Sequence, residues 1–155
     1  MKCLQELKCY DCSSIDDECV KLLSEASSQI QHFAADLIWP RRFTDKALQY
    51  FAQSQIPLKG LTILDWKVTD NGIRQLGERG IEIESLILSG CFITDSILEI
   101  IAEKFPTLRL IYIIDCDKVT SNAIQKLRQN FIGKLKVESD YYQLSQSAIK
   151  SRWLK

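Results

Sequence analysis

The spacing of apolar residues changes within short stretches of this chain. Leu86 and Leu88 stand two residues apart, which is typical of a strand with one buried face. After Thr94 the apolar residues follow at helical spacing, as at Ile97 and Ile101. The pattern therefore predicts a short strand followed by an amphipathic helix.

The same pattern recurs along the chain. Leu86–Asp95 repeats Leu61–Asp70 at an offset of 25 residues, and a third copy at Ile111–Thr120 carries one extra residue. Self-similarity at a period of about 20 to 50 residues indicates a repeat architecture. Extending the frame in both directions gives six units, whose opening apolar residues are Leu4, Ile30, Leu58, Ile83, Leu108 and Ile132.

A residue that can cap a helix stands where the spacing changes in each unit. A side-chain oxygen at this position accepts a backbone N–H of the first helical turn. Acidic residues often follow, as at Asp70 and Asp95, where they favour a helix amino terminus. The capping positions are Asp16, Thr44, Thr69, Thr94, Thr120 and Ser145.

The second unit allows two frames. Opening it at Phe33 would turn Asp36 inward, and an unpaired buried carboxylate is costly. Opening it at Ile30 also keeps the distance of 14 residues from a capping position to the next opening residue, as in three other units. We therefore choose Ile30. The extra length then falls at residues 39–42, where Pro40 suits a loop.

The cysteines follow the repeat. Cys12, Cys91 and Cys116 occupy one position, the Asn or Cys slot of a leucine-rich repeat. This favours buried thiols that pack as small apolar groups. A zinc site would need Cys3, Cys9, Cys12 and Cys19 together, in a spacing that matches structural zinc sites poorly. We therefore expect no metal and no cofactor.

These units resemble the cysteine-containing leucine-rich repeats of F-box substrate receptors, which carry Leu-x-Leu-x-x-Cys-x-x-Ile-Thr-Asp. The match covers residues 4 to 153 and is strongest at Leu86–Asp95 and Ile111–Thr120. The chain is also similar to mitochondrial ATP synthase coupling factor B and to eukaryote-like repeat effectors of intracellular bacteria. The resemblance implies a substrate receptor, an assembly or coupling factor of a mitochondrial complex, or an effector that engages a host protein. An F-box would precede the first repeat, which begins at Leu4, so docking to a ubiquitin ligase is not expected.

The predicted fold is an α/β leucine-rich-repeat solenoid, a right-handed β-α superhelix. A strand and a helix cannot bury both apolar faces alone, so neighbouring units must stack. We expect one domain over residues 1–155, with a parallel concave sheet and helices on the convex side. Six strands at about 4.8 Å spacing would make a sheet roughly 25 Å wide, enough to hold a peptide or one face of a small domain.

The concave face is the predicted binding surface. Alternate strand residues point there, and five of them, Leu64, Ile87, Leu110, Tyr112 and Ile114, form an apolar patch rimmed by charged residues. An exposed patch of this kind marks a protein-binding site, with Tyr112 as the anchor. The predicted partner-binding residues are Tyr10, Leu64, Asp65, Ile87, Leu110, Tyr112, Ile114 and Asp115.

Other occupants of this surface stay open. A second copy of the chain or the chain's own tail could cover the patch. The strand from Leu4 to Tyr10 also has an open backbone edge, where a second copy could pair. Asp11, Asp65 and Asp115 recur at strand ends, either as an acidic rim or as solvated loop residues.

Composition narrows the function further. Lys and Arg number 20, as do Asp and Glu, so nucleic acid is a poor candidate partner. The longest apolar run has five residues where a membrane span needs about 20. Neither a phosphate-binding loop nor a catalytic motif is found, and His32 is the only histidine in the sequence. We predict a non-catalytic interaction module of the cytoplasm, or of the host cytosol for a secreted effector.

Overall fold

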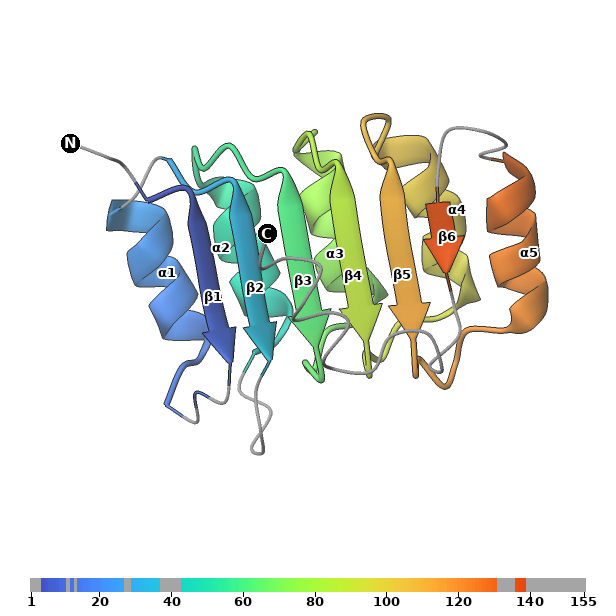
Figure 1. Ribbon diagram of the computed structural model, residues 1–155, viewed down its shortest axis with the longest axis horizontal. Helices are drawn as coiled ribbons and strands as arrows, with labels where there is room; N and C mark the ends of the chain where they lie inside the picture. The colour runs from blue at the N-terminus through green and yellow to red at the C-terminus, as the bar shows by residue number, and fades with distance from the viewer. Residues whose placement is uncertain are drawn as a thin grey trace.

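The computed structural model describes residues 4–10, 12, 14–26, 29–36, 43–130 and 136–138. In these ranges strands and helices alternate (Figure 1). The strands are Glu6–Tyr10 (β1), His32–Asp36 (β2), Gly60–Leu64 (β3), Ser85–Ser89 (β4), Leu110–Ile114 (β5) and Lys136–Glu138 (β6). The helices are Asp17–Ala26 (α1), Asp45–Gln53 (α2), Asp70–Glu78 (α3), Asp95–Lys104 (α4) and Ser121–Asn130 (α5).

The six strands form one parallel sheet in chain order, and the helices lie together on one of its sides (Figure 1). Equivalent positions of successive units are direct neighbours in the sheet. Leu61 of β3, for example, lies opposite Phe33 of β2 and Leu86 of β4. Each unit therefore adds one strand and one helix to the stack. The chain is an α/β leucine-rich-repeat solenoid, as the sequence predicts.

The main core lies between the sheet and the helices. Its strand residues are the ones predicted to point inward, and Leu61, Leu86 and Ile111 are at most 1% exposed. Ile30 is fully buried, which confirms the frame chosen for the second unit. Asp36 pairs with Tyr10 and Leu64 and so belongs to the opposite face. The predicted loop at residues 39–42 lies outside the described residues.

Trp66 replaces cysteine in the third unit and is accommodated by aromatic neighbours. It is fully buried, and its ring centroid lies 4.1 Å from that of Phe43. Phe33 meets it edge to face at 6.2 Å. The indole N–H donates to the carbonyl of Ala35 at 3.2 Å, so no polar atom is left unsatisfied. Two large phenylalanines in the second unit thus match the large residue in the third.

The capping residues act at the helix amino termini with one exception. The hydroxyls of Thr44 and Thr69 accept the backbone N–H groups of Lys46 and Asn71. Thr94 does not cap its own helix as predicted. Its hydroxyl donates to Asp70 of the preceding unit, as the other capping threonines do to their aspartates, and lies 3.0 Å from the hydroxyl of Ser96. Ser145, the sixth predicted cap, lies outside the described residues.

The first unit departs from the predicted helical stripe. Cys19 was expected to be inward-facing, but it is exposed, while Val20 beside it is buried. The physical reason is its place at the end of the stack. The equivalent residues Ala47 and Ile97 are buried because a preceding unit lies against them.

Candidate protein-binding face

The sheet carries a second apolar cluster on the face turned away from the helices. We call it the concave apolar cluster and define it as Leu64, Ile87, Tyr112 and Ile114, with Leu110 packed against it. It is separate from the main core. Ile87 lies directly opposite Tyr112 in the sheet, so large side chains of neighbouring strands pack side by side. The structure therefore brings together these five predicted binding residues.

The predicted exposure of this cluster is wrong. Tyr112 is 4% exposed, Ile87 and Ile114 are 3% exposed, and Leu64 is 7% exposed. Only Leu110 is half-buried. Strand alternation determines the face on which a side chain lies. The solvent area left to it depends on everything that packs over it, and a strand pattern does not contain that information.

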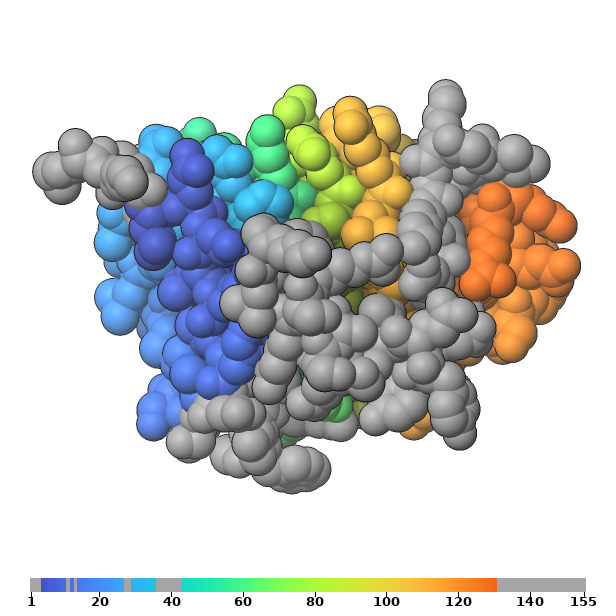
Figure 2. All heavy atoms as spheres, in the orientation of Figure 1, coloured from blue at the N-terminus to red at the C-terminus, as the bar shows by residue number. Residues whose placement is uncertain are grey.

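The other half of the same face is polar and more accessible. In the view onto the sheet, β1 and β2 lie at the surface at one end of the molecule (Figure 2). Glu6 is exposed, and Lys8, Tyr10 and His32 are half-buried. Lys8 and Glu6 form an ion pair at 2.9 Å. We call Glu6, Lys8, Tyr10 and His32 the polar half of the face.

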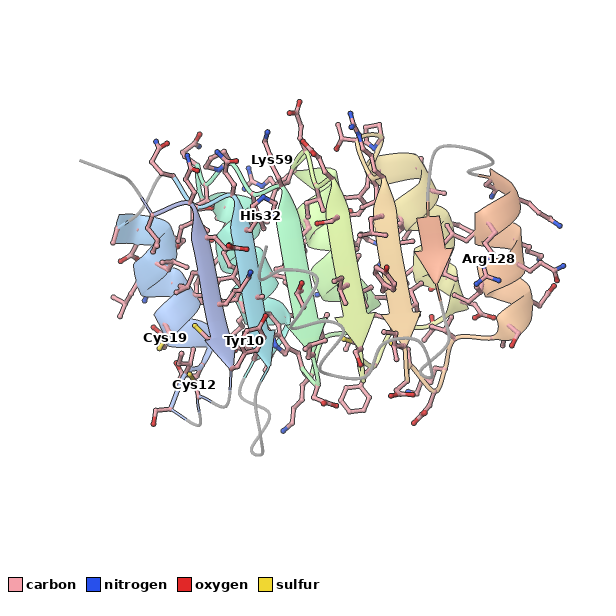
Figure 3. All side chains as sticks on the ribbon, viewed as in Figure 1. Tyr10, Cys12, Cys19, His32, Lys59 and Arg128 are labelled. Carbon is pink, nitrogen blue, oxygen red and sulfur yellow. The ribbon has the colours of Figure 1, made fainter. Side chains whose placement is uncertain are left out.

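Gly60 makes room for His32 in this polar half. A Cβ atom at Gly60 would lie 2.3 Å from His32 Nδ1 and 3.0 Å from Ser85 Oγ, so any side chain there would displace the imidazole. His32 lies at the beginning of β2 and Tyr10 at the end of β1 (Figure 3). The hollow between these strands encloses about 10 Å³, which is room for about one water. A hollow of this size is too small to enclose a small-molecule ligand.

The sequence analysis placed Glu6, Lys8, His32 and Ser85 on the concave side but did not select them for binding. Its criterion was an apolar patch, and these residues are polar. The absence of a side chain at Gly60 was the available signal, because glycine is otherwise unfavourable inside a strand.

The strand-end aspartates have a conformational role. Asp65 and Asp115 have φ of 59° and 50°, in the left-handed region that aspartate tolerates better than most residues. Gly90 has φ of 61° at the equivalent position of the unit between them. This turn lets Asp65 N–H donate to Ser89 and Gly90 N–H to Ile114, which extends the sheet pairing past the strands. Asp11, the third member of the predicted rim, lies outside the described residues.

Three of the described cysteines are buried, namely Cys9, Cys91 and Cys116. A hydrogen bond with the Cys116 thiol, followed by burial, raises the pKa of Cys91 well above its usual 9.0. Burial is the main cause that raises the pKa of Cys9. Cys12 is half-buried and packs against the core.

Metal binding and membrane insertion find no support in the described part of the chain. Within those ranges no three His, Cys, Asp or Glu side chains are grouped so that they could hold a metal ion. Cys3, the remaining member of the predicted alternative zinc set, lies outside them. Among the described helices, none is both long and apolar enough to cross a membrane.

Comparisons with known proteins give a distant structural match. No protein-family model matches the chain. Among solved structures, it is similar to a chain in the crystal structure of the yeast Rad7 and Elc1 complex, with a TM-score of 0.38 and 14% sequence identity. The match covers 87% of this chain and 56% of that one, so the chain spans little more than half the length of this structural neighbour.

Proposed function

We propose that this chain is a non-catalytic module that binds a partner protein on the concave face of its sheet. The observation that carries the proposal is a strand face with its own organised apolar cluster, separate from the main core. The stacked units of a solenoid bury the helix-facing side of its sheet, so stacking does not by itself require apolar residues on the other side. A second apolar cluster on the other side, buried except at Leu110, gives the accessible polar half a rigid floor, and this supports a role in recognition.

The small volumes of the surface hollows support a protein as the partner. Small-molecule sites usually enclose about 300 to 1,000 Å³. The hollow beside His32 encloses about 10 Å³, and three other hollows lined by described residues measure 190 to 260 Å³. Among these hollows, the one beside His32 lies on the concave face. A broad, shallow surface of this kind fits a partner's surface side chains.

The two halves of the face have different proposed roles. The polar half makes the first contacts, with Tyr10 as the accessible aromatic anchor, since tyrosine is enriched among interface hot spots. The concave apolar cluster forms a rigid floor beside it, with Leu110 at its accessible edge. Asp65 and Asp115 border this floor at the strand ends. We retain the cytosol as the proposed setting, since the described cysteines are free thiols.

Site-specific crosslinking tests this proposal. A photoreactive amino acid replaces Ser85, which lines the polar hollow, or Glu99, which is exposed on helix α4. We expect a discrete protein adduct from position 85 and none of the same mass from position 99. With the photoreactive amino acid at position 10 instead, the Ser85→Arg substitution should reduce the amount of adduct. The Glu99→Arg substitution should leave the amount of adduct unchanged. Equal adducts from both positions would contradict binding on the concave face.

A further inference from the structure

The first unit exposes the surface that later units use to contact the unit before them. The third residue after each capping position shows this. Ala47 and Ile97 are fully buried, and a Cβ atom added at Gly72 would lie 2.9 Å from Leu48 of the preceding helix. The equivalent residue of α1 is Cys19, which is exposed. This position therefore faces the open end of the stack.

The sixth residue after a capping position also faces the preceding unit. Tyr50 of α2 reaches back toward the preceding helix, where its hydroxyl donates to Glu18 at 3.3 Å. The equivalent residue of α1 is Leu22, and it is 63% exposed. Cys19, Leu22 and Ala26 are all exposed and are spaced three and four residues apart. They form an apolar stripe on the outer side of the outermost helix.

Strand β1 lies at the same end. In the sheet of described strands it has β2 as its one neighbour (Figure 1). The carbonyl of Gln5 accepts from the N–H groups of Gln31 and His32 on the β2 side. Because backbone groups alternate in direction along a strand, those of Glu6 point away from β2. Leu4, just before the strand, is 54% exposed. The edge of β1 and the stripe on α1 thus lie at the same end of the molecule, and we call them together the end surface (Figure 1).

We propose that a second copy of this chain docks on this end surface, with β1 paired antiparallel to β1 of the other copy about a two-fold axis. A two-fold axis at Leu7 sets Glu6 of each copy opposite Lys8 of the other. Glu6 and Lys8 both lie on the concave side, so the two charged pairs face the same way. The strand is thus complementary to itself in charge.

The same axis brings the two helices together. It is perpendicular to the sheet, so both copies keep their helices on one side and α1 meets α1 antiparallel through Cys19, Leu22 and Ala26. The paired strands would continue one sheet through both molecules. The self-complementary order of Glu6 and Lys8 distinguishes a second copy from an unrelated strand, because an isologous interface requires each patch to match itself.

Reversing the charges of Glu6 and Lys8 tests the proposed dimer. Glu6→Lys alone sets lysine against Lys8, and Lys8→Glu alone sets glutamate against Glu6. Each single variant should weaken dimerisation about tenfold, because like charges then oppose each other twice. The double variant Glu6→Lys/Lys8→Glu restores opposite charges and should recover the wild-type dissociation constant. Lys59→Glu reverses a lysine that precedes the central strand β3, away from the proposed interface, and should leave the dissociation constant unchanged.

Sedimentation equilibrium over a range of concentrations, with reductant present to exclude disulfide links through Cys19, measures these constants. We expect a species of twice 17.8 kDa for the wild type and for the double variant. Leu22→Glu should yield monomers with an unchanged circular dichroism spectrum, since Leu22 is exposed. A wild type that is monomeric at every concentration would overturn the proposal. So would dimers that the single charge variants leave intact.

Discussion

Asp70 in helix α3 joins its unit to the next by binding Thr94. Its carboxylate accepts the backbone N–H of Thr94 at 2.7 Å and the threonine hydroxyl at 2.5 Å. The same two bonds recur in the pairs Asp17–Thr44, Asp45–Thr69 and Asp95–Thr120. Ser121 stands where the next aspartate would be, so this series ends in the fifth unit. Each aspartate therefore satisfies the backbone N–H of the capping threonine in the following unit.

Removing Asp70 should destabilise the stack. We expect Asp70→Ala to lower the free energy of unfolding by about 2 to 3 kcal/mol, because hydrogen bonds to charged groups contribute about 1.5 to 3 kcal/mol and this site is partly buried. Urea denaturation measures the change. Asp117→Ala, in an exposed turn, is the control and should stay within about 0.5 kcal/mol. Equal losses in both variants would contradict the role of the Asp70–Thr94 pair.

Gly90 should not tolerate a side chain. Its φ of 61° costs other residues about 1 to 2 kcal/mol, and a Cβ atom would lie 2.3 Å from Asp65 Oδ1. Gly90→Ala should therefore lower the melting temperature. In an Asp65→Ala background the same substitution should cost less, because the contact with the carboxylate is gone. Thermal denaturation of the four proteins in this cycle measures the difference, and an equal cost in both backgrounds would exclude the contact with Asp65.

Thiol reactivity should separate the cysteines at pH 8. Cys19 is exposed and should react with a disulfide reagent first. Cys91 should stay unreactive, because its raised pKa keeps it a protonated thiol and burial blocks access. Raising the pH from 8 to 9 should leave Cys91 protected until the chain unfolds. Mass spectrometry after timed labelling assigns the sites. Labelling of Cys91 at the rate of Cys19 would show that its environment is open.

The concave apolar cluster should contribute to stability as well as to binding. Ile87 is 3% exposed, so we expect Ile87→Ala to cost about 2 to 4 kcal/mol through lost burial and the cavity left behind. Ser89→Ala, a half-buried position on the same strand, should change stability by less than about 0.5 kcal/mol. Chemical denaturation compares the two variants. A negligible effect of Ile87→Ala would mean that the cluster is open to solvent, as the sequence analysis expected.

The sequence by itself determined the repeat frame, the order of strand and helix, and the face on which each strand residue lies. These properties are local, because a period of two or of three to four residues assigns each apolar side chain to one side of its own element. The frame at Ile30 and the separation of Ile87 and Tyr112 from the main core follow from it.

The tertiary structure decided which of these residues are exposed to solvent and which residues of neighbouring units are joined by hydrogen bonds. Tyr112 lies on the predicted face yet is buried, and Cys19 follows the predicted stripe yet is exposed. In both cases the outcome depends on what packs against the residue from another part of the fold. The bonds from Asp70 to Thr94 have the same origin: they join residues 24 positions apart that meet only when the units stack.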